Sequence, residues 1–232
     1  MSGARVAVTT TRDRIGPAVG AVRAAGLDPV VLPCVAVEPA PHHVRAGVAR
    51  RACAAEALVV TSARAVEILW PRGGMPGVPA AVVGTTTAAA VREAGGRVAV
   101  VGDGGLSALM SQAAHLLAGR TVVYPHSART GGDALAALRG ACRRLVATVV
   151  YDTRSVKPDA SVSVDVAMFA SPSAVYGWLA ARPLAPVARV AIGPTTAAAL
   201  AAAGYAADAV ASHPSYAALA VAARLVVPGK VA

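Results

Sequence analysis

Aromatic residues, cysteines and lysines are all scarce in this chain of 232 residues. Aromatics make up only 3%, and none lies in a run typical of RNA-binding modules that stack bases. The three cysteines, Cys34, Cys53 and Cys142, stand far apart, which excludes a disulfide-stabilised fold. Because no Cys-x-x-Cys pair or Cys and His cluster occurs, we also expect no structural metal site.

Charged residues are few as well, at 15%, while hydrophobic residues make up 56%. This balance excludes an intrinsically disordered chain. The uncharged stretch 190–207 is mostly alanine and contains Gly193 and Pro194, so we expect no membrane-spanning helix. The N-terminus enters a strand-like segment without the apolar region of a signal peptide, which predicts a cytoplasmic protein.

The common motifs of nucleotide-binding and hydrolytic enzymes are missing. The chain has no GxGxxG, no GxxxxGKS/T and no GxSxG, and its five histidines lack metal-ligand spacing. An enzyme with this sequence is expected to use no cofactor and no metal. Its substrate would have to supply most of the reactivity.

Arginine dominates the charge of the chain. Basic residues outnumber acidic ones by 22 to 12, and only Lys157 and Lys230 are lysines. One interpretation is the composition of a GC-rich coding sequence; the other is an anionic partner. Non-specific binding of nucleic acid is the weaker form of the second interpretation, because the chain has so few aromatics.

Short apolar segments alternate with alanine-rich helical segments along the whole chain. This alternation predicts an α/β fold with parallel sheets, and ten strands fit two five-stranded sheets better than one. The expected strands are Arg5–Thr9, Pro29–Cys34, Ala57–Thr61, Ala80–Val83, Val98–Val101, Thr121–Tyr124, Leu145–Tyr151, Val166–Phe169, Arg189–Ile192 and Ala207–Ala211.

An internal repeat with a spacing of 109 residues supports two related halves. Two pairs of segments match at this one offset, and the helices that follow end in Ala-Gly pairs, as helix C-termini often do. The matches are Leu58–Val66 with Ala167–Val175, Val83–Ala90 with Ile192–Ala199, and the helix ends Ala94-Gly95 with Ala203-Gly204.

Two domain arrangements fit this repeat. The halves either follow one another, or the chain leaves the first domain after Cys34, builds the second, and returns after Tyr151. In the second arrangement residues 41–147 hold twelve arginines against five acidic residues. The rest of the chain is basic too, so a cleft between the domains would attract an anion.

Four turns share one design, in which a strand is followed by Ser or Thr and then by the first turn of a helix. Ser and Thr commonly cap helices, and this structural role explains any one of the turns. Four of them in two related domains also predict a ligand site, because such turns meet at the carboxyl edge of a parallel sheet, where ligands bind. The turns are Thr61-Ser62, Gly84–Thr87, Ser171–Ser173 and Gly193–Thr196, with Gly84 and Gly193 allowing close approach of a ligand.

Tyr151 ends the apolar segment that begins at Leu145. A tyrosine at a strand end is often half buried for packing alone. The functional interpretation is a phenol at the domain junction that donates a proton to a ligand.

The chain resembles the uroporphyrinogen-III synthase family over nearly its whole length. The strongest pair of matches is Phe169–Val175 followed about twenty residues later by Ile192–Ala197. The other matching segments are Val8–Arg12, Leu32-Pro33, Thr61-Ser62, Val83–Ala88, Val150–Thr153 and Pro214–Leu219.

The resemblance implies two flavodoxin-like, Rossmann-like α/β domains joined by a two-stranded β linker, with the second domain inserted in the first. For this chain it implies one domain at 1–33 and 155–232, another at 41–147, and linker strands at 34–40 and 148–154.

The implied substrate is hydroxymethylbilane, a linear tetrapyrrole with eight carboxylates, bound in the cleft between the domains. Loss of water gives an azafulvene, ring D attacks through its substituted carbon, and a spiro intermediate recloses as uroporphyrinogen III with ring D inverted. The resemblance implies no cofactor. From the composition we expect no membrane span and no nucleic-acid partner, and we expect a monomer. An inactive tetrapyrrole-binding or regulatory protein of the same fold is the alternative.

The resemblance also assigns residues. Tyr151 matches the tyrosine thought to assist departure of the hydroxyl, and is the implied catalytic residue. Arg64 departs from the family, where many relatives carry Asn. The implied substrate-binding residues are Arg12, Thr61, Ser62, Gly84, Thr86, Thr87, Ser171, Ser173, Gly193, Thr195 and Thr196.

Overall fold

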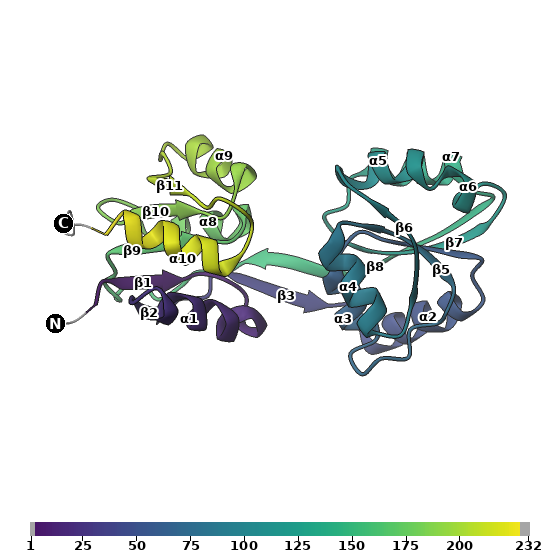
Figure 1. The fold of residues 1–232 in the computed structure, drawn as a ribbon, viewed down its shortest axis with the longest axis horizontal. Helices are drawn as coiled ribbons and strands as arrows, with labels where there is room; N and C mark the ends of the chain where they lie inside the picture. Colours follow the sequence, from purple (N-terminus) through teal and green to yellow (C-terminus); the bar gives the residue numbers. More distant parts are fainter. Residues whose placement is uncertain (1–2, 228–232) are drawn as a thin grey trace. The chain divides into compact units, whose positions relative to one another are not determined.

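The computed structural model describes residues 3–227 and divides the chain into two compact units. Unit 1 comprises residues 1–37 and 154–232, and unit 2 comprises residues 38–153. The chain therefore passes between the units twice, and unit 2 is an insertion in unit 1 (Figure 1).

Unit 1 is built on a five-stranded sheet in the order β11-β10-β9-β1-β2, in which all neighbours are parallel. Alternate strand residues face opposite sides, so Val6 and Val8 lie in one core and Ala7 in the other. Helices α1 and α10 cover the first side, and α8 and α9 the second. The elements are β1 (Arg5–Val8), η1 (Arg12–Arg14), α1 (Ile15–Ala24), β2 (Asp28–Val31), β9 (Val166–Phe169), α8 (Pro172–Leu179), β10 (Ala188–Ala191), α9 (Pro194–Ala202), β11 (Ala209–Val210) and α10 (Tyr216–Leu225).

Unit 2 is built on a six-stranded sheet in the order β3-β8-β7-β4-β5-β6. Figure 1 shows α5, α6 and α7 on one side of this sheet and α2, α3 and α4 on the other. The elements are β3 (Val35–Pro39), α2 (His42–Cys53), β4 (Ala57–Val60), α3 (Ala63–Leu69), β5 (Pro79–Val83), α4 (Thr85–Glu93), β6 (Arg97–Gly102), α5 (Gly105–Gln112), α6 (Ala114–Leu117), β7 (Thr121–Ser127), α7 (Gly132–Ala141) and β8 (Arg144–Ser155).

Strands β4 to β8 of this sheet are parallel, whereas β3 runs against β8. The amide of Ala40 donates to the carbonyl of Val150, and the amide of Val156 donates to the carbonyl of Cys34. This pairing, in which one residue number rises as the other falls, is that of antiparallel neighbours. The two segments that connect the units are thus hydrogen-bonded to each other.

The predicted fold class is confirmed: two parallel α/β units, one inserted in the other. The prediction of ten strands in two five-stranded sheets is wrong, because the described residues form eleven strands in sheets of five and six. The extra strand is β3, where the residue pattern alone predicted no strand and the family resemblance implied a linker strand. Its pairing with β8 depends on residues more than a hundred positions away. The predicted limits of the two domains and linkers stay a prediction.

The repeat corresponds to equivalent positions in the two sheets. An offset of 109 residues places β4 on β9 and β5 on β10. The helices after the second pair end as predicted, with left-handed glycines at Gly95 (φ +87°) and Gly204 (φ +83°). None of the helices in the described part of the chain has the length and apolar character that a bilayer crossing needs.

Candidate active site

The turn after β4 carries two hydroxyl side chains, Thr61 and Ser62, that each contact a phenol. Ser62 is the N-cap of α3, and its Oγ accepts the amide N–H of Arg64 at 3.2 Å. The same Oγ accepts the phenol O–H of Tyr151 at 3.2 Å. Tyr151 is 9% exposed on β8, two strands away from β4 in the sheet. The structure therefore brings together the implied catalytic tyrosine and one of the implied binding serines.

A second phenol lies between these residues. Tyr124 is on β7, the strand that separates β8 from β4, and its hydroxyl lies 3.2 Å from Thr61 Oγ1. Its ring stacks on His126 with 5.1 Å between centroids, and His126 Nδ1 lies 2.9 Å from the carbonyl oxygen of Ser127. Both Tyr124 and His126 are buried. Tyr124 thus fixes the position of Thr61, just as Tyr151 contacts Ser62.

Sequence reasoning missed Tyr124 and His126. The available signal was that the predicted strand Thr121–Tyr124 ends in a tyrosine, as does the predicted strand Leu145–Tyr151. Two tyrosines at the ends of neighbouring parallel strands point to the same edge of the sheet.

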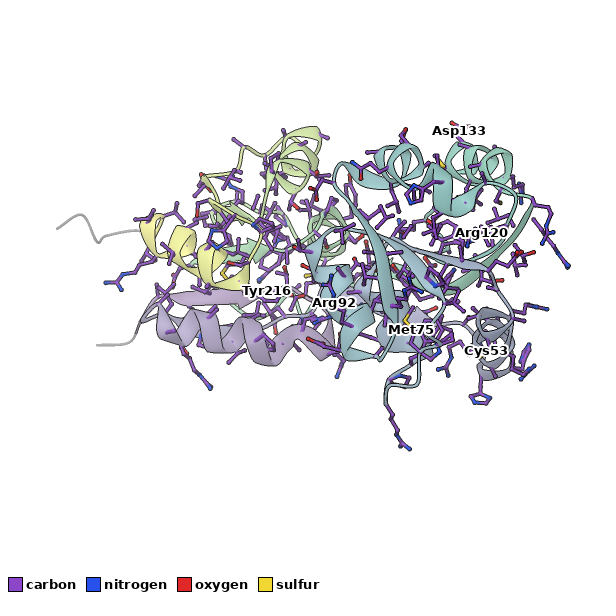
Figure 2. All side chains as sticks on the ribbon, turned by 45° about the vertical axis from the view of Figure 1, so that its right-hand side comes forward. Cys53, Met75, Arg92, Arg120, Asp133 and Tyr216 are labelled. Carbon is purple, nitrogen blue, oxygen red and sulfur yellow. The ribbon has the colours of Figure 1, made fainter. Side chains whose placement is uncertain are left out.

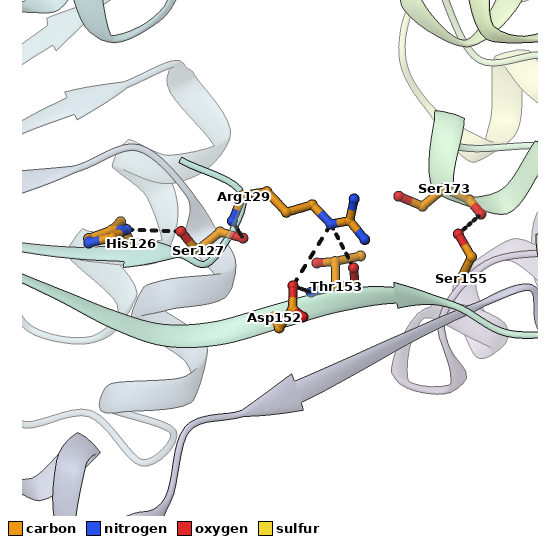
Figure 3. A network of polar contacts seen from close by, with 7 residues as sticks. All are labelled: His126, Ser127, Arg129, Asp152, Thr153, Ser155 and Ser173. Carbon is orange, nitrogen blue, oxygen red and sulfur yellow. Dashed lines mark hydrogen bonds and ion pairs between the residues drawn. The ribbon is translucent and has the colours of Figure 1, made fainter. Parts of the chain in front are cut away.

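An ion pair holds the strand end that carries Tyr151. The side chain of Arg129 lies 3.8 Å from the carboxylate of Asp152 and donates to the carbonyl of Thr153 at 2.7 Å (Figure 3). Asp152 also accepts the amide N–H of Thr153 at 2.7 Å. These contacts connect the loop after β7 to the segment directly after Tyr151.

The turn after β5 is shaped by Gly84, whose φ of +77° favours glycine. Gly84 stands at the N-cap of α4, and no side chain caps this helix. In the first turn Thr86 is exposed, whereas Thr87 is only 5% exposed. Of these predicted site residues, Thr86 is the one whose hydroxyl is open to a ligand.

In unit 1 the turn after β9 repeats the serine cap. The Oγ of Ser171 accepts the amide N–H of Ala174 at 3.4 Å, and Pro172 follows in the first helical turn. The carbonyl of Ser173 accepts the hydroxyl of Ser155 at 2.8 Å (Figure 3). Ser155 ends β8, so this bond ties the return segment of the chain to the start of α8.

The turn after β10 differs from its counterpart after β5. Gly193 has a φ of −178°, which is extended backbone that any residue adopts, so its conformation does not require glycine. Open space surrounds the position where its Cβ would be, which leaves the room that the sequence prediction needs. Thr195 is exposed and Thr196 is 3% exposed, the same division as in Thr86 and Thr87.

Arg12 lines a groove that includes no residue of the two predicted Ser and Thr turns of unit 1. It opens η1 and is exposed beside a groove of about 550 Å³, in the segment that follows β1. The groove is also lined by Asp13, Leu32-Pro33, Val35–Val37 and Val156–Asp159, so Arg12 and Lys157 lie beside the acidic Asp13 and Asp159. Arg12 follows β1 at the carboxyl edge of the unit 1 sheet, in a groove that holds two cationic and two acidic side chains.

One hydroxyl pair in unit 1 escaped the sequence analysis. Thr10 Oγ1 and the phenol oxygen of Tyr216 lie 2.8 Å apart, between the end of β1 and the start of α10 (Figure 2 labels Tyr216). The match to Pro214–Leu219 contained this tyrosine without assigning it a role.

The thiol of Cys34 does not contribute chemistry at the carboxyl edge of the unit 1 sheet. Burial raises the pKa of the Cys34 thiol to about 12, so the thiol stays protonated at neutral pH. Its sulfur donates to the carbonyl of Leu32 at 3.3 Å. The candidate chemistry is therefore that of hydroxyls and phenols.

The comparisons with known proteins agree with this picture. The family model of uroporphyrinogen-III synthase HemD matches residues 17–220. The fold is similar to the solved uroporphyrinogen-III synthetase of Helicobacter pylori, with a TM-score of 0.65 at 20% identity over 94% of this chain and 96% of that one.

Two structures of the uroporphyrinogen III synthase of Thermus thermophilus are similar as well. A mutant gives a TM-score of 0.59 at 19% identity, covering 93% of this chain and 95% of that chain. The wild-type enzyme gives 0.53 at 21% identity, covering 99% and 100%. No curated protein sequence matches significantly. From the family model, the chain belongs to the uroporphyrinogen-III synthase family, the cyclising lyases of porphyrin biosynthesis.

Proposed function

We propose that this chain cyclises hydroxymethylbilane to uroporphyrinogen III, with loss of water and inversion of ring D, and that Tyr151 is its catalytic residue. The observation that carries the proposal is the bond from the Tyr151 phenol to Ser62, at the carboxyl edge of a sheet, in a member of this family. The substrate is bound by the Ser and Thr turns of both units.

The turns suit a polyacidic ligand. The first turns of α4 and α9 have no side-chain cap, whereas Ser171 caps α8 by accepting the amide N–H of Ala174. First-turn N–H groups without a partner in the helix bind carboxylates. Thr86 and Thr195 add exposed hydroxyls beside two of these helix starts. Arg12 and the excess of arginine in both units favour an anion over a neutral ligand.

Tyr151 supplies a proton in the first step. The phenol O–H turns from Ser62 to the hydroxymethyl oxygen of the substrate, the C–O bond breaks, and water leaves with that proton. Ser62 still accepts the amide N–H of Arg64, so its own O–H is free to donate to the phenolate that remains. Such a hydrogen bond stabilises the charged form of the tyrosine.

The later steps depend mainly on position. The substituted carbon of ring D attacks the azafulvene, and the spiro intermediate breaks one C–C bond and recloses with ring D inverted. The proton that ring D loses on closure returns to the phenolate of Tyr151, so the enzyme ends in its starting state. The uncatalysed competitor closes without inversion, so the enzyme has to hold one folded conformation of the bilane. Turns on the two units provide separate anchors for carboxylates along the chain of rings.

The test is an isomer assay. Purified protein is incubated with hydroxymethylbilane, the products are oxidised, and the type I and type III isomers are separated. We expect mainly type III, formed faster than the type I product of a protein-free control. Type I alone, at the spontaneous rate, would refute the proposal, and tight binding of bilane without turnover would support the inactive alternative.

We further propose that the protein works as a cytoplasmic monomer without a nucleic-acid partner. The proposed substrate is a small molecule, and the proposed chemistry uses side chains of a single chain. Sedimentation velocity of the purified protein, with and without single-stranded DNA, tests the monomeric state and the absence of a nucleic-acid partner. A stable dimer or a DNA complex at physiological salt would contradict them.

A further inference from the structure

The edge of the unit 2 sheet is only partly covered by β3. Strand β8 has twelve residues, whereas β3 has five. The bond from the Ala40 amide to the Val150 carbonyl marks the end of their pairing, and the chain turns into α2 at His42. Residues 144–149 of β8 therefore lie beyond β3, with β7 on their other side. Their outward backbone groups form an open strand edge.

A groove of about 620 Å³ runs along this open edge. Five consecutive β8 residues, Arg144–Thr148, line it. Successive residues of a strand point to opposite faces, so a groove lined by all of them follows the edge of the strand. The ends of α2 and α7 border it through Arg51, Ala54 and Arg139.

The groove is positively charged. Arg51, Arg139 and Arg144 line it, all three are exposed, and no acidic residue is among its lining residues. Within residues 3–227 none of the three forms an ion pair. The nearby carboxylate of Glu56 is engaged by Arg143 at 2.6 Å and by the Thr121 amide at 2.8 Å. Three cations without carboxylates thus flank an unpaired row of backbone groups.

We propose that this groove binds an extended acidic peptide segment of another protein, which adds a strand to the open edge of β8. The peptide backbone would pair with the outward N–H and C=O groups, as in other cases of β-strand addition. Carboxylates on the added strand would meet the arginines of α2, α7 and β8.

Other occupants fit this groove less well. A second copy of the chain would bring the same three arginines against one another. A small anion would leave the strand edge unused. Single-stranded nucleic acid prefers aromatic side chains for base stacking, and none lines the groove. Only an acidic strand would contact the three arginines and also pair with the open backbone groups of β8.

This inference does not rest on the proposed function. The groove lies where β7 and β8 begin, at Thr121 and Arg144. The Ser and Thr turns of the same unit follow the carboxyl ends of β4 and β5. The groove therefore lies toward the amino ends of the strands and the turns lie at their carboxyl ends. Either proposal can fail without the other.

The test uses the full chain and a short fluorescein-labelled peptide that alternates glutamate and valine. Fluorescence anisotropy should show binding that weakens as salt is added. The peptide with glutamine in place of glutamate should bind at least about 10-fold more weakly, because it keeps the strand and loses the charge.

Charge reversal locates the site. Arg51→Glu, Arg139→Glu and Arg144→Glu should each weaken peptide binding by about 3- to 10-fold, as expected for reversing an exposed charge. Arg97→Glu is the matched control, since Arg97 is exposed at the start of β6, the strand at the opposite edge of the same sheet. It should leave the affinity unchanged.

Hydrogen exchange tests the strand pairing. Bound peptide should slow exchange of amides within residues 145–149 and leave those of β6 unaffected. The proposal is overturned if the glutamate peptide does not bind, if Arg97→Glu weakens it equally, or if the β8 amides gain no protection. Full displacement by inorganic phosphate or single-stranded DNA, or a dimer that Arg144→Glu dissociates, would overturn it in favour of those occupants.

Discussion

The two units have the same sheet but a different order of strands along the chain. Unit 1 reads β2-β1-β9-β10-β11 across its sheet, and unit 2 reads β8-β7-β4-β5-β6 before β3 is added. The pair β1 and β2 comes first along the chain in unit 1, whereas the equivalent pair in unit 2, β7 and β8, comes last. Position in the sheet, and not order in the chain, therefore decides where each Ser and Thr turn lies.

One hydrogen bond to the backbone occurs at equivalent positions in the two sheets. Asp165, just before β9, accepts the amide N–H of Arg5 at 2.7 Å. Glu56, 109 residues earlier and just before β4, accepts the amide N–H of Thr121 at 2.8 Å. In both units an acidic residue thus binds the first amide of the neighbouring strand. The similarity extends to interactions that no short motif reveals.

The units differ in how phenols reach the turns. In unit 2 two strand tyrosines contact the turn after β4, through Thr61 and Ser62. In unit 1 the phenol of Tyr216 comes from a helix and contacts Thr10, after β1. One architecture therefore supports different chemistry in its two copies, and the following predictions test where that difference matters.

The largest expected effect concerns a close contact that unit 2 lacks. Gly177 lies on α8, and a Cβ there would stand 2.2 Å from the carbonyl oxygen of Cys34 and 2.7 Å from that of Val156. Ile68 occupies the matching position of α3. Gly177→Ala should lower the free energy of unfolding by about 3 kcal/mol or more, because two backbone segments must move.

Urea denaturation measures this loss. Gly20→Ala is the control, since Gly20 lies on helix α1 with open space around its Cβ position. It should change stability by at most about 1 kcal/mol, in the stabilising direction. Equal stability of the two variants would mean that α8 does not need the glycine.

The second prediction compares the phenols of the two units. Tyr151→Phe should lower the rate of type III formation by about 100-fold, a typical value for loss of a general acid. Tyr216→Phe removes the hydroxyl near Thr10 and should lower it by less than about 3-fold. The isomer assay measures both, and Tyr176→Phe, on an exposed helix position, is the control. A larger loss at Tyr216 than at Tyr151 would place the chemistry in unit 1.

The third prediction compares matching glycines. Gly84 has a φ of +77°, whereas Gly193 has a φ of −178°. Gly84→Ala should cost about 1 to 2 kcal/mol of unfolding free energy, the strain of a left-handed residue with a Cβ. Gly193→Ala should change stability by less than about 0.5 kcal/mol. Denaturation curves of both variants decide this, and equal losses would show that the turns are alike.

The smallest effect is a pH dependence in unit 1. Arg189 donates to Asp208 through two side-chain bonds of 2.8 Å and one backbone bond of 2.7 Å. These bonds, led by those of the guanidinium, lower the pKa of Asp208 below its usual 3.8. The pair therefore stabilises the fold above about pH 4, and the stabilisation is lost as pH falls further through the lowered pKa.

Asp208→Asn should lower the free energy of unfolding by about 1 kcal/mol at pH 7, after allowance for solvent screening. The difference from the unmodified chain should shrink below pH 4. Glu56→Gln is the comparison in unit 2, where the carboxylate is more exposed and the effect at pH 7 should be smaller. A difference that persists undiminished at pH 2 would contradict the assignment.

Local patterns in the sequence predicted many features of this structure. The serine caps at Ser62 and Ser171 and the helix-ending glycines Gly95 and Gly204 all depend on residues within a few positions. The repeat added the relation between the two sheets. These features could be predicted because their partners lie nearby in the sequence.

Features that depend on distant partners could not be predicted from local sequence patterns. Strand β3 joins a sheet only because β8 returns beside it, a pairing that the family resemblance implied and the residue pattern alone did not. Tyr124, on which His126 stacks, contacts Thr61 from a strand some sixty residues away. The place of Tyr124 at a strand end was the one sequence signal for that contact. Gly193 is a different case: it shares a motif with Gly84, yet the two glycines have different backbone conformations, which the motif does not reveal.

The central claim is that turns from both units hold the substrate. It is tested most directly by calorimetric binding of an unreactive bilane that carries methyl in place of hydroxymethyl. Thr86→Val in unit 2 and Thr195→Val in unit 1 each remove one exposed hydroxyl. We predict that each variant binds the bilane about 3- to 10-fold more weakly, as expected for the loss of one hydrogen bond of typical strength. Unchanged affinity in either variant would contradict the account.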